Sequence, residues 1–464
     1  MKSGIAAGHP ATAEAGVEIL ADGGSAADAA VAAVLASCVA ETVMTGLLGG
    51  GHAVYYDGST GYARNLDCFC AVPGLGAEWH DPQLVHLEVP FGAELVHYAV
   101  GPASCAVPGV PAGLGMLWEE HGLLPWARLF EPALRLARDG VPMPSAHAAC
   151  LRMLEPVMTM REGSRIYAPG GTLLRDGELL RQPGLAVALE SLAAEGADGA
   201  YSGTIGHALL ELAGERGGLV TADDLAAYSA SWSEPVETTW LGRRVLTRGG
   251  LSAVPETLAR LPLLHGLSPA DRVVALVDAF DGASGPETHT TNLVTVDAGG
   301  NACVVTTSLG LGSGDWLPGL DVHLNSMLGE ADLLRGPLEP GARMDSMMAP
   351  TLVVGSDGLE LAIGAAGGTR LRTALLTVAA GILDERLEPQ AAVERPRVHP
   401  AAAVVNAEPG VDEDGLARLG ARGREIRRWP EQHHYFGGVT ALGRTGAAAD
   451  PRRSGAALPA PTAG

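Results

Sequence analysis

Residues 26–40 form the longest apolar run in the chain, and this run constrains the fold more than any other segment. Alanine makes up most of it and Asp28 is its only charged residue, so the pattern predicts a helix with few polar residues on any face. A transmembrane helix needs about 20 consecutive apolar residues, and this run is shorter. We therefore expect a helix that is buried on nearly all sides within a soluble protein.

Before Thr290 the sequence predicts helices alternating with short strands. Residues 12–21, 184–194 and 222–228 have helical patterns, and residues 52–56 have the pattern of a strand. Glycines separate several of these segments, as is usual at the ends of helices. The first part of the chain is therefore expected to be rich in helix.

From Thr290 onward the sequence predicts mostly sheet. The runs T-T-N-L-V-T-V-D and A-C-V-V-T-T-S are rich in β-branched residues, and a Gly-Gly-Asn turn between them predicts a hairpin. A second pair of strands is expected at residues 351–354 and 359–363, followed by G-A-A-G-G and a helix at residues 369–382. The Pro- and Ala-rich tail, residues 458–464, is expected to be loose.

Composition excludes several classes of function. The net charge is −22 without a stripe of Lys or Arg, which argues against a nucleic-acid partner. The cysteines lack zinc-ligand spacing, and the adjacent His433 and His434 are expected to be surface histidines, so we predict no metal and no cofactor. No basic segment followed by an apolar one opens the chain, which predicts a cytoplasmic protein without a membrane partner, unless a leader was removed.

Thr290 and Thr291 begin the predicted hairpin directly after a polar, turn-like segment, residues 284–289. A threonine hydroxyl needs a base beside it to act as a nucleophile. The residue's own α-amine, with a pKa of about 7.7–8.0, can serve once the preceding peptide bond is cut. β-Branched residues also favour strands without any catalytic role, so this pair alone leaves both interpretations open.

Further segments, in order and spacing, resemble those of the γ-glutamyltransferases. They include G-H-P-A-T-A-E-A-G-V-E-I-L-A-D-G-G-S near the N-terminus, then G-V-P-A-G-L, H-L-N-S-M-L-G-E, G-A-A-G-G-T-R and P-R-V-H, and finally A-D-P-R-R-S-G-A-A. The resemblance spans nearly the whole chain. It implies the α+β fold of the N-terminal nucleophile hydrolases, a four-layer αββα sandwich with two stacked antiparallel sheets between helical layers. It also implies a precursor whose large part, residues 1–289, and small part, residues 290–464, form one intertwined domain.

The same resemblance implies roles for individual residues. Thr290 matches the nucleophile, and Gly367 and Gly368 match the pair whose backbone N–H groups form the oxyanion hole. Glu330 matches the acid that holds the α-amino group of the substrate. Ser346 matches the first of two serines that hold its α-carboxylate.

The chain also departs from the family pattern. Phe69 stands two residues after a Leu-Asp pair, where the family has its carboxylate-binding arginine, and Met347 stands in place of the second serine. With Thr291, Phe69 completes the expected substrate-binding set. Gly310 occupies the position of an asparagine, and Asn292 that of a histidine. The carboxylate clamp is therefore weakened unless another arginine substitutes, the candidates being Arg64, Arg343 and Arg370.

The expected reaction is acyl transfer from an amide to Thr290 and then to water or an amine. Glutathione-like γ-glutamyl amides are the first-choice substrates, and the segment between Glu330 and Ser346 is short, which predicts an open site. One alternative is an acylase for other amides, similar to the cephalosporin acylases. Another is an uncleaved, inactive homologue that binds amino-acid-like ligands.

Overall fold

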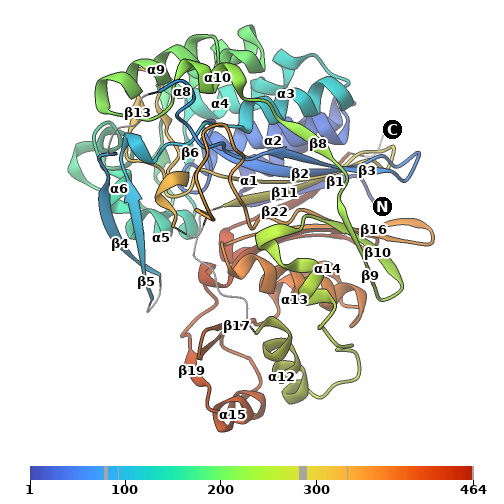
Figure 1. Cartoon of the computed structure of the whole chain (residues 1–464). Coiled ribbons are helices and arrows are strands. Elements are labelled where there is room, and N and C mark those ends of the chain that lie inside the picture. Colours follow the sequence, from blue (N-terminus) through green and yellow to red (C-terminus); the bar gives the residue numbers. More distant parts are fainter. Residues whose placement is uncertain (78–81, 92–93, 282–289, 332, 462–464) are drawn as a thin grey trace.

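The computed structural model describes residues 1–77, 82–91, 94–281, 290–331 and 333–461. Within these residues two large antiparallel sheets lie face to face at the centre of the molecule (Figure 1). In spatial order, the strands of the first sheet are β22 (Ala456–Pro459), β1 (Gly4–Ala7), β11 (Thr291–Val296), β12 (Ala302–Ser308), β2 (Gly50–Tyr56), β3 (Ala63–Cys68) and β8 (Ser231–Ser233). Those of the second are β21 (Ala447–Ala449), β20 (Gly438–Gly443), β16 (Gly358–Ala366), β15 (Thr351–Gly355), β10 (Arg243–Thr247) and β9 (Val236–Trp240).

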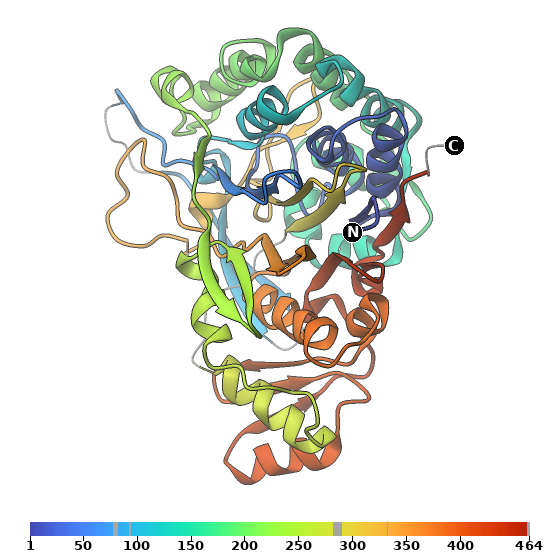
Figure 2. The same ribbon diagram turned by 90° about the vertical axis from the view of Figure 1, so that its right-hand side faces the viewer.

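Helices cover the outer face of each sheet (Figures 1 and 2). Over or beside the first sheet lie α1 (Pro10–Ala21), α2 (Ala26–Ala40), α3 (Val110–His121), α4 (Glu131–Asp139), α5 (Ser145–Met153), α6 (Glu155–Met158), α7 (Gly163–Tyr167), α8 (Pro183–Glu195), α9 (Thr204–Arg216) and α10 (Ala222–Ala227). On the side of the second sheet lie α11 (Val254–Leu258), α12 (Pro269–Phe280), α13 (Arg370–Leu383), α14 (Pro389–Glu394) and α15 (Glu413–Ala421).

Short sheets attach to this framework. They are formed by β4 (Val85–Phe91) with β5 (Glu94–Val100), β6 (Val141–Pro142) with β7 (Leu179–Leu180), β13 (Trp316–Leu317) with β14 (Val322–His323), and β17 (Val398–Ala401) with β18 (Val404–Ala407) and β19 (Glu425–Arg428). No helix of the described residues is long and apolar enough to span a membrane.

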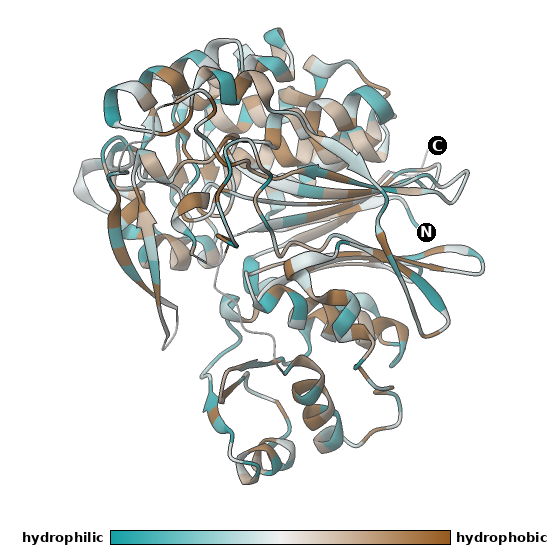
Figure 3. Ribbon diagram, in the orientation of Figure 1, coloured by the Kyte–Doolittle hydropathy of each residue, from teal (hydrophilic) through white to brown (hydrophobic). Residues whose placement is uncertain are grey.

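The apolar core follows the layers. On β11, Leu293 packs against the helices above the first sheet, and the next residue, Val294, packs against the second sheet. A further cluster lies between the second sheet and α13, and it includes Ile363 and Leu375. Figure 3 shows the apolar residues on the strands of both sheets. The αββα sandwich expected from the sequence is confirmed.

Helix α2 lies inside this structure as its composition predicts, with every residue buried. Asp28, its acidic residue, caps the helix: its carboxylate accepts from the Ser25 N–H at 2.9 Å, and the Ser25 hydroxyl accepts from the Asp28 N–H at 3.0 Å. The same carboxylate accepts from the Leu123 N–H at 2.8 Å, so it also anchors the segment after α3.

Both predicted hairpins are present. β11 pairs with β12 around Gly300, which has φ +80°, and β15 pairs with β16 around Gly358, with φ +92°. Both sheets contain strands from either side of Thr290, because β1 and β2 flank the first hairpin and β10 pairs with β15. The parts before and after Thr290 therefore share their sheets and cores.

Two expectations were wrong. The tail is not loose where the structure describes it, because Leu458 and Pro459 pair with β1 as part of β22. His434 is buried rather than exposed, and His433 is half-buried. The ring of Trp429 lies 4.9 Å from that of His433, so aromatic packing accounts for the burial of this pair.

Candidate active site

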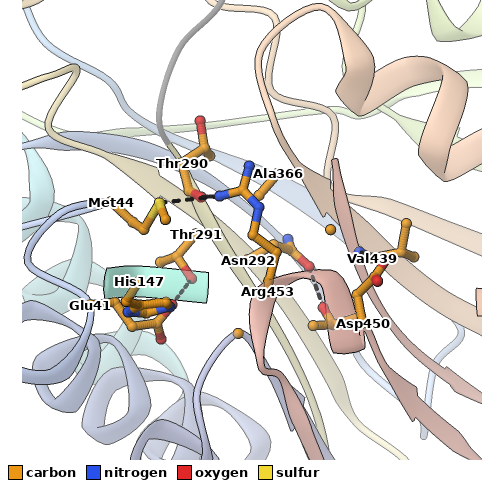
Figure 4. A pocket seen from close by; sticks show the side chains of 13 residues that line it. Glu41, Met44, His147, Thr290, Thr291, Asn292, Ala366, Val439, Asp450 and Arg453 are labelled. Atoms are coloured by element: carbon orange, nitrogen blue, oxygen red, sulfur yellow. Dashed lines mark hydrogen bonds between the residues drawn. The ribbon is translucent and has the colours of Figure 1, made fainter. Parts of the chain in front are cut away.

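Thr290 directly precedes β11 and is buried, with 2% of its surface exposed. It borders a cavity of about 20 Å³, which can hold about one water molecule (Figure 4). The other lining residues are Gly8, Glu41, Met44, His147, Thr291, Asn292, Ala366, Gly438, Val439, Thr440, Asp450 and Arg453. Residues from both sheets, and from both sides of Thr290 in the sequence, meet at this point.

The register of the first sheet gathers the ends of its central strands on one side. Thr291 pairs with Thr307 of β12, which pairs with Gly51 of β2. Gly51 pairs in turn with Cys68 of β3, the residue before Phe69. Since neighbouring strands lie about 4.8 Å apart, Phe69 lies about 14 Å from the start of β11.

Gly367 and Gly368 follow β16 in the second sheet and lead into α13. Both have positive φ, +128° and +57°, so the conformation favours glycine. A Cβ atom on Gly367 would lie 2.8 Å from the Cα of Gly437 and 3.4 Å from Nη2 of Arg453. The preceding Ala366 lines the cavity together with Thr290. The predicted oxyanion-hole glycines thus lie beside the predicted nucleophile.

The Thr291 side chain points toward Glu41, at the end of α2 (Figure 4). Its hydroxyl donates to one carboxylate oxygen of Glu41, and the Thr12 hydroxyl donates to the other at 2.7 Å. Burial raises the pKa of Glu41 from 4.5 to about 7, although both hydroxyl donors act in the opposite direction. The predicted role of Thr291 in substrate binding stays a prediction, because its hydroxyl is engaged with Glu41.

Asn292 connects the two sheets beneath Thr290. Its amide nitrogen donates to the Val305 carbonyl at 2.9 Å and to the Thr306 hydroxyl at 2.8 Å, both on β12. Its amide oxygen accepts from the Thr440 hydroxyl on β20 of the second sheet. The residue that replaces the family's histidine therefore fixes the position of β11 between the sheets.

Arg453 contacts the backbone of Thr290. It ends the 3-10 turn Pro451–Arg453 and is buried, with 7% of its surface exposed. Its Nη1 donates to the Thr290 carbonyl at 3.3 Å and lies 3.1 Å from the sulfur of Met44. Figure 4 shows the guanidinium directed at Thr290.

Glu330 is buried near the end of β12. A Cβ atom on Gly310 would lie 2.5 Å from a carboxylate oxygen of Glu330 and 2.6 Å from the Ser326 hydroxyl. Gly310 itself donates its N–H to the hydroxyl of Ser308, the last residue of β12, at 2.9 Å. The missing side chain at Gly310 thus gives Glu330 room beside the same end of the first sheet.

Phe69 belongs to an apolar cluster at that sheet end. It is 1% exposed and stacks on His52, with 5.6 Å between ring centroids. The other buried members of the cluster are Cys70, Val72, Ala106, Met327, Leu333, Met344, Met347 and Met348. Both positions at which the carboxylate clamp is altered, Phe69 and Met347, therefore lie in one methionine-rich cluster.

Ser346 lies at the edge of this cluster. Its hydroxyl accepts from the Met348 N–H at 3.2 Å, and its carbonyl accepts from Arg248 at 2.7 Å. Its predicted contact with a substrate carboxylate stays a prediction.

Of the arginines considered as substitutes in the clamp, Arg343 adjoins Phe69. It donates to the Phe69 carbonyl at 2.5 Å and forms an ion pair with Asp67 at 3.4 Å. Arg64 pairs instead with a glutamate on α3, and Arg370 donates to a backbone carbonyl near the C-terminus. Arg343 is therefore the candidate best placed to contact a carboxylate near Phe69.

The sequence did not point to Glu41, His147 or Arg453. Glu41 ends an apolar helix, where a lone acid is unusual, and Arg453 lies in the matched tail A-D-P-R-R-S-G-A-A. These were usable signals, whereas nothing in the sequence around His147 indicates its place beside the cavity. Among the described residues, no three His, Cys, Asp or Glu side chains gather as a metal site.

Known proteins share the sequence and the fold of this chain over most of its length. The family model described as Gamma-glutamyltranspeptidase matches residues 12–281 and 271–460. The acylase ACY 1 proenzyme of Pseudomonas sp. (strain V22) is 28% identical, with 94% of this chain and 89% of that protein covered. The glutathione hydrolase proenzyme of Bacillus subtilis (strain 168) is 26% identical, with 98% and 91% covered.

Among solved structures, the cephalosporin acylase from Bacillus halodurans superposes with a TM-score of 0.82 at 25% identity, covering 98% of this chain and 96% of that one. The family model covers almost the whole chain and the fold agrees across the same length. The chain therefore belongs to the γ-glutamyltranspeptidase family of hydrolase and transferase enzymes.

Proposed function

We propose that this chain is a self-processing amidohydrolase and acyltransferase with Thr290 as its nucleophile. The observation that carries this proposal is the position of Thr290 at the start of β11, next to the glycine turn that ends β16. A nucleophile and a pair of close backbone N–H groups are the main requirements of acyl transfer. Thr290 directly precedes β11 and the two glycines directly follow β16, so strands hold both groups in place.

In the proposed reaction the Thr290 hydroxyl oxygen attacks the carbonyl carbon of the substrate amide. The α-amine of Thr290 takes the hydroxyl proton, and the backbone N–H groups of Gly367 and Gly368 stabilise the oxyanion. The tetrahedral intermediate then expels the amine, which takes the proton from the Thr290 ammonium group. The resulting ester is cleaved by water or by an acceptor amine.

The α-amine becomes available when the bond between His289 and Thr290 is cut. In the proposed self-cleavage the Thr290 hydroxyl attacks the carbonyl carbon of His289, and water hydrolyses the ester that forms. The cleavage segment, residues 282–289, lies outside the described residues. The division into residues 1–289 and 290–464 is therefore part of the proposal, and the proenzyme names of the relatives support it.

γ-Glutamyl amides such as glutathione are the first-choice acyl donors. Glu330 can hold the α-amino group of such a donor, because it is a buried carboxylate at the same sheet end as Thr290. The glutathione hydrolase relatives support this choice.

An acylase for amides that lack the α-carboxylate is the second candidate. The buried cluster around Phe69 and Met347 favours it, since an apolar surface cannot compensate the desolvation of a carboxylate. The acylase relatives support the same alternative.

A set of four anilides separates these candidates: γ-glutamyl, 4-aminobutyryl, glutaryl and butyryl p-nitroanilide. They share the acyl chain length, and they differ in whether the amino group, the carboxylate or both are present. If Glu330 recognises the amino group and the clamp is weak, loss of the carboxylate changes kcat/KM less than about 10-fold. Loss of the amino group then lowers it about 10- to 150-fold, the usual effect of one charge-assisted hydrogen bond.

The Glu330→Gln variant provides the control. It is expected to lower kcat/KM for the two amino-bearing anilides and to leave the other two unchanged. A strong dependence of kcat/KM on the carboxylate would instead indicate strict γ-glutamyl specificity. No turnover of any anilide by an uncut chain would support the inactive homologue instead.

A further inference from the structure

Two neighbouring arginines after β21 differ in how their charge is balanced. Arg452 forms ion pairs with Glu408 at 2.5 Å and with Asp450 at 3.2 Å. Arg453, as deeply buried, has no carboxylate within ion-pair distance in the described part of the chain. Its Nε also lacks a hydrogen-bond partner among those residues. A buried cation without a carboxylate in direct contact is costly, so its retention calls for an explanation in the site that it borders.

The surrounding backbone makes room for this guanidinium. A Cβ atom on Gly438 would lie 2.3 Å from Cγ of Arg453, and one on Gly367 would lie 3.4 Å from its Nη2. The guanidinium therefore occupies the space between the oxyanion-hole turn and the Thr290 carbonyl, which accepts from its Nη1 at 3.3 Å.

We propose that Arg453 is a positioning residue for Thr290: it fixes the threonine backbone through the carbonyl and disfavours protonation of the freed α-amine. This inference rests on the proposed function of Thr290. It assigns to Arg453 a part in preparing the base, distinct from any contact with the substrate.

The geometry supports an electrostatic effect on the amine. The nitrogen and the carbonyl oxygen of one residue are separated by three bonds, so the Arg453 Nη1 lies within about 7 Å of the Thr290 nitrogen. A positive charge at this range makes a second positive charge less favourable, especially in a site with little water. The ordinary pKa of an α-amine, about 7.7–8.0, is therefore expected to fall, and more of the amine is neutral at pH 7.

The other charged or titratable residues that line the cavity offset this effect only in part. Glu41 has a pKa raised to about 7 by burial, so only part of it is ionised at pH 7. Burial, together with His9 and Arg453, holds the pKa of His147 well below its usual value, which leaves that imidazole neutral. Asp450 is already paired with Arg397 at 2.6 Å and with Arg452.

Proton transfer links this charge to the rate. The neutral amine must accept the hydroxyl proton when Thr290 attacks, and the ammonium group then returns that proton to the leaving amine. Enzyme whose amine is already protonated cannot begin the reaction. The kcat/KM value should therefore rise with pH through the pKa of the amine.

The test is the pH profile of kcat/KM, measured on the purified, processed chain with the best of the four anilides. The Arg453→Met variant removes the charge, and Arg453→Lys keeps it. Arg372→Met is the matched control, because Arg372 is also buried and donates to a backbone carbonyl, that of Phe280, at 3.1 Å. Intact mass gives the extent of cleavage for each variant.

We expect the acidic limb of the profile to move about 1 pH unit upward in Arg453→Met. At pH values on the acidic limb this shift lowers kcat/KM about 10-fold relative to the original chain. On the alkaline plateau kcat/KM stays within about 3-fold of that of the original chain. Arg453→Lys and Arg372→Met should keep the limb within about 0.3 unit of the original chain. If Arg453→Met stays uncut, a cleaved Arg453→Lys with an unmoved limb supports the proposal.

An unmoved limb in Arg453→Met, or an equal shift in the control, overturns the proposal, as does an uncut or strongly shifted Arg453→Lys. Failure of the underlying function looks different. In that case the unsubstituted chain itself would not be cut before Thr290, whatever residue stands at position 453.

Discussion

The proposed site has a nucleophile end, around Thr290, and a clamp end, around Phe69 and Met347. Different kinds of contact form these two ends. Around Thr290 the contacts are polar and largely involve backbone, as with the Arg453 bond to the Thr290 carbonyl and the turn at Gly367. Around Phe69 and Met347 the contacts are apolar side chains. Substitution of side chains leaves backbone groups in place, whereas recognition of a carboxylate depends on the side chains themselves. The comparison indicates that the reaction and its specificity can change separately.

The largest effect is expected at the nucleophile end, from Gly367→Ala. The added Cβ would lie 2.8 Å from the Gly437 Cα, so the turn must shift and its N–H groups leave their positions. Loss of one oxyanion donor typically lowers kcat about 100- to 1,000-fold. Gly266→Ala is the control, since Gly266 also has positive φ, +83°, but open space around it. Equal losses in both variants, measured with the anilides, would show that strain alone is responsible.

The next effect concerns Glu41, behind the nucleophile. Because its pKa is raised from 4.5 to about 7, the folded state binds the proton more tightly than the unfolded state. As the pH rises from 4.5 to 7, the free energy of unfolding should therefore fall by about 3 kcal/mol, at about 1.4 kcal/mol per pH unit. Glu41→Gln removes this contribution, so the stability of the variant relative to the parent should rise by that amount as the pH rises over the same range.

This comparison is best made by urea unfolding in a Thr290→Ala background, where the chain is expected to remain whole. The difference between the glutamine and glutamate chains isolates Glu41 from other titrating groups. A difference that is constant between pH 4.5 and pH 7 would contradict the raised pKa.

The smallest effect is expected at the clamp end, from Phe69→Arg. A guanidinium there could pair with a substrate carboxylate, so the preference for γ-glutamyl over 4-aminobutyryl anilide should rise about 10-fold or more. Phe69→Leu keeps the position apolar and should leave this ratio unchanged. No change in the ratio with arginine would show that position 69 does not contact the carboxylate.

Local sequence patterns predicted the elements that carry the nucleophile end. The β-branched runs after Thr290 gave the hairpin of β11 and β12, and G-A-A-G-G marked the turn at Gly367. The apolar run of α2 predicted its complete burial. These succeeded because strand propensity, glycine turns and burial depend on residues close together in the sequence.

Contacts between distant segments were not predictable in this way. Arg453 meets Thr290 only because β20 and β21 bring the end of the chain beside β11, and Glu41 meets Thr291 only because α2 lies on the first sheet. The prediction of a loose tail failed for the same reason: Pro and Ala suggest a loose end locally, but the tail pairs with the distant strand β1. The aromatic packing that buries His434 also comes from tertiary structure.

The central claim is that Thr290 becomes the N-terminal residue and the nucleophile. Intact mass and N-terminal sequencing of the purified chain and of Thr290→Ala test it most directly. We expect two fragments from the original chain, the smaller beginning Thr-Thr-Asn-Leu, and one uncut, inactive chain from the variant. A single chain in both cases, or cleavage at the same bond in Thr290→Ala, would contradict the account.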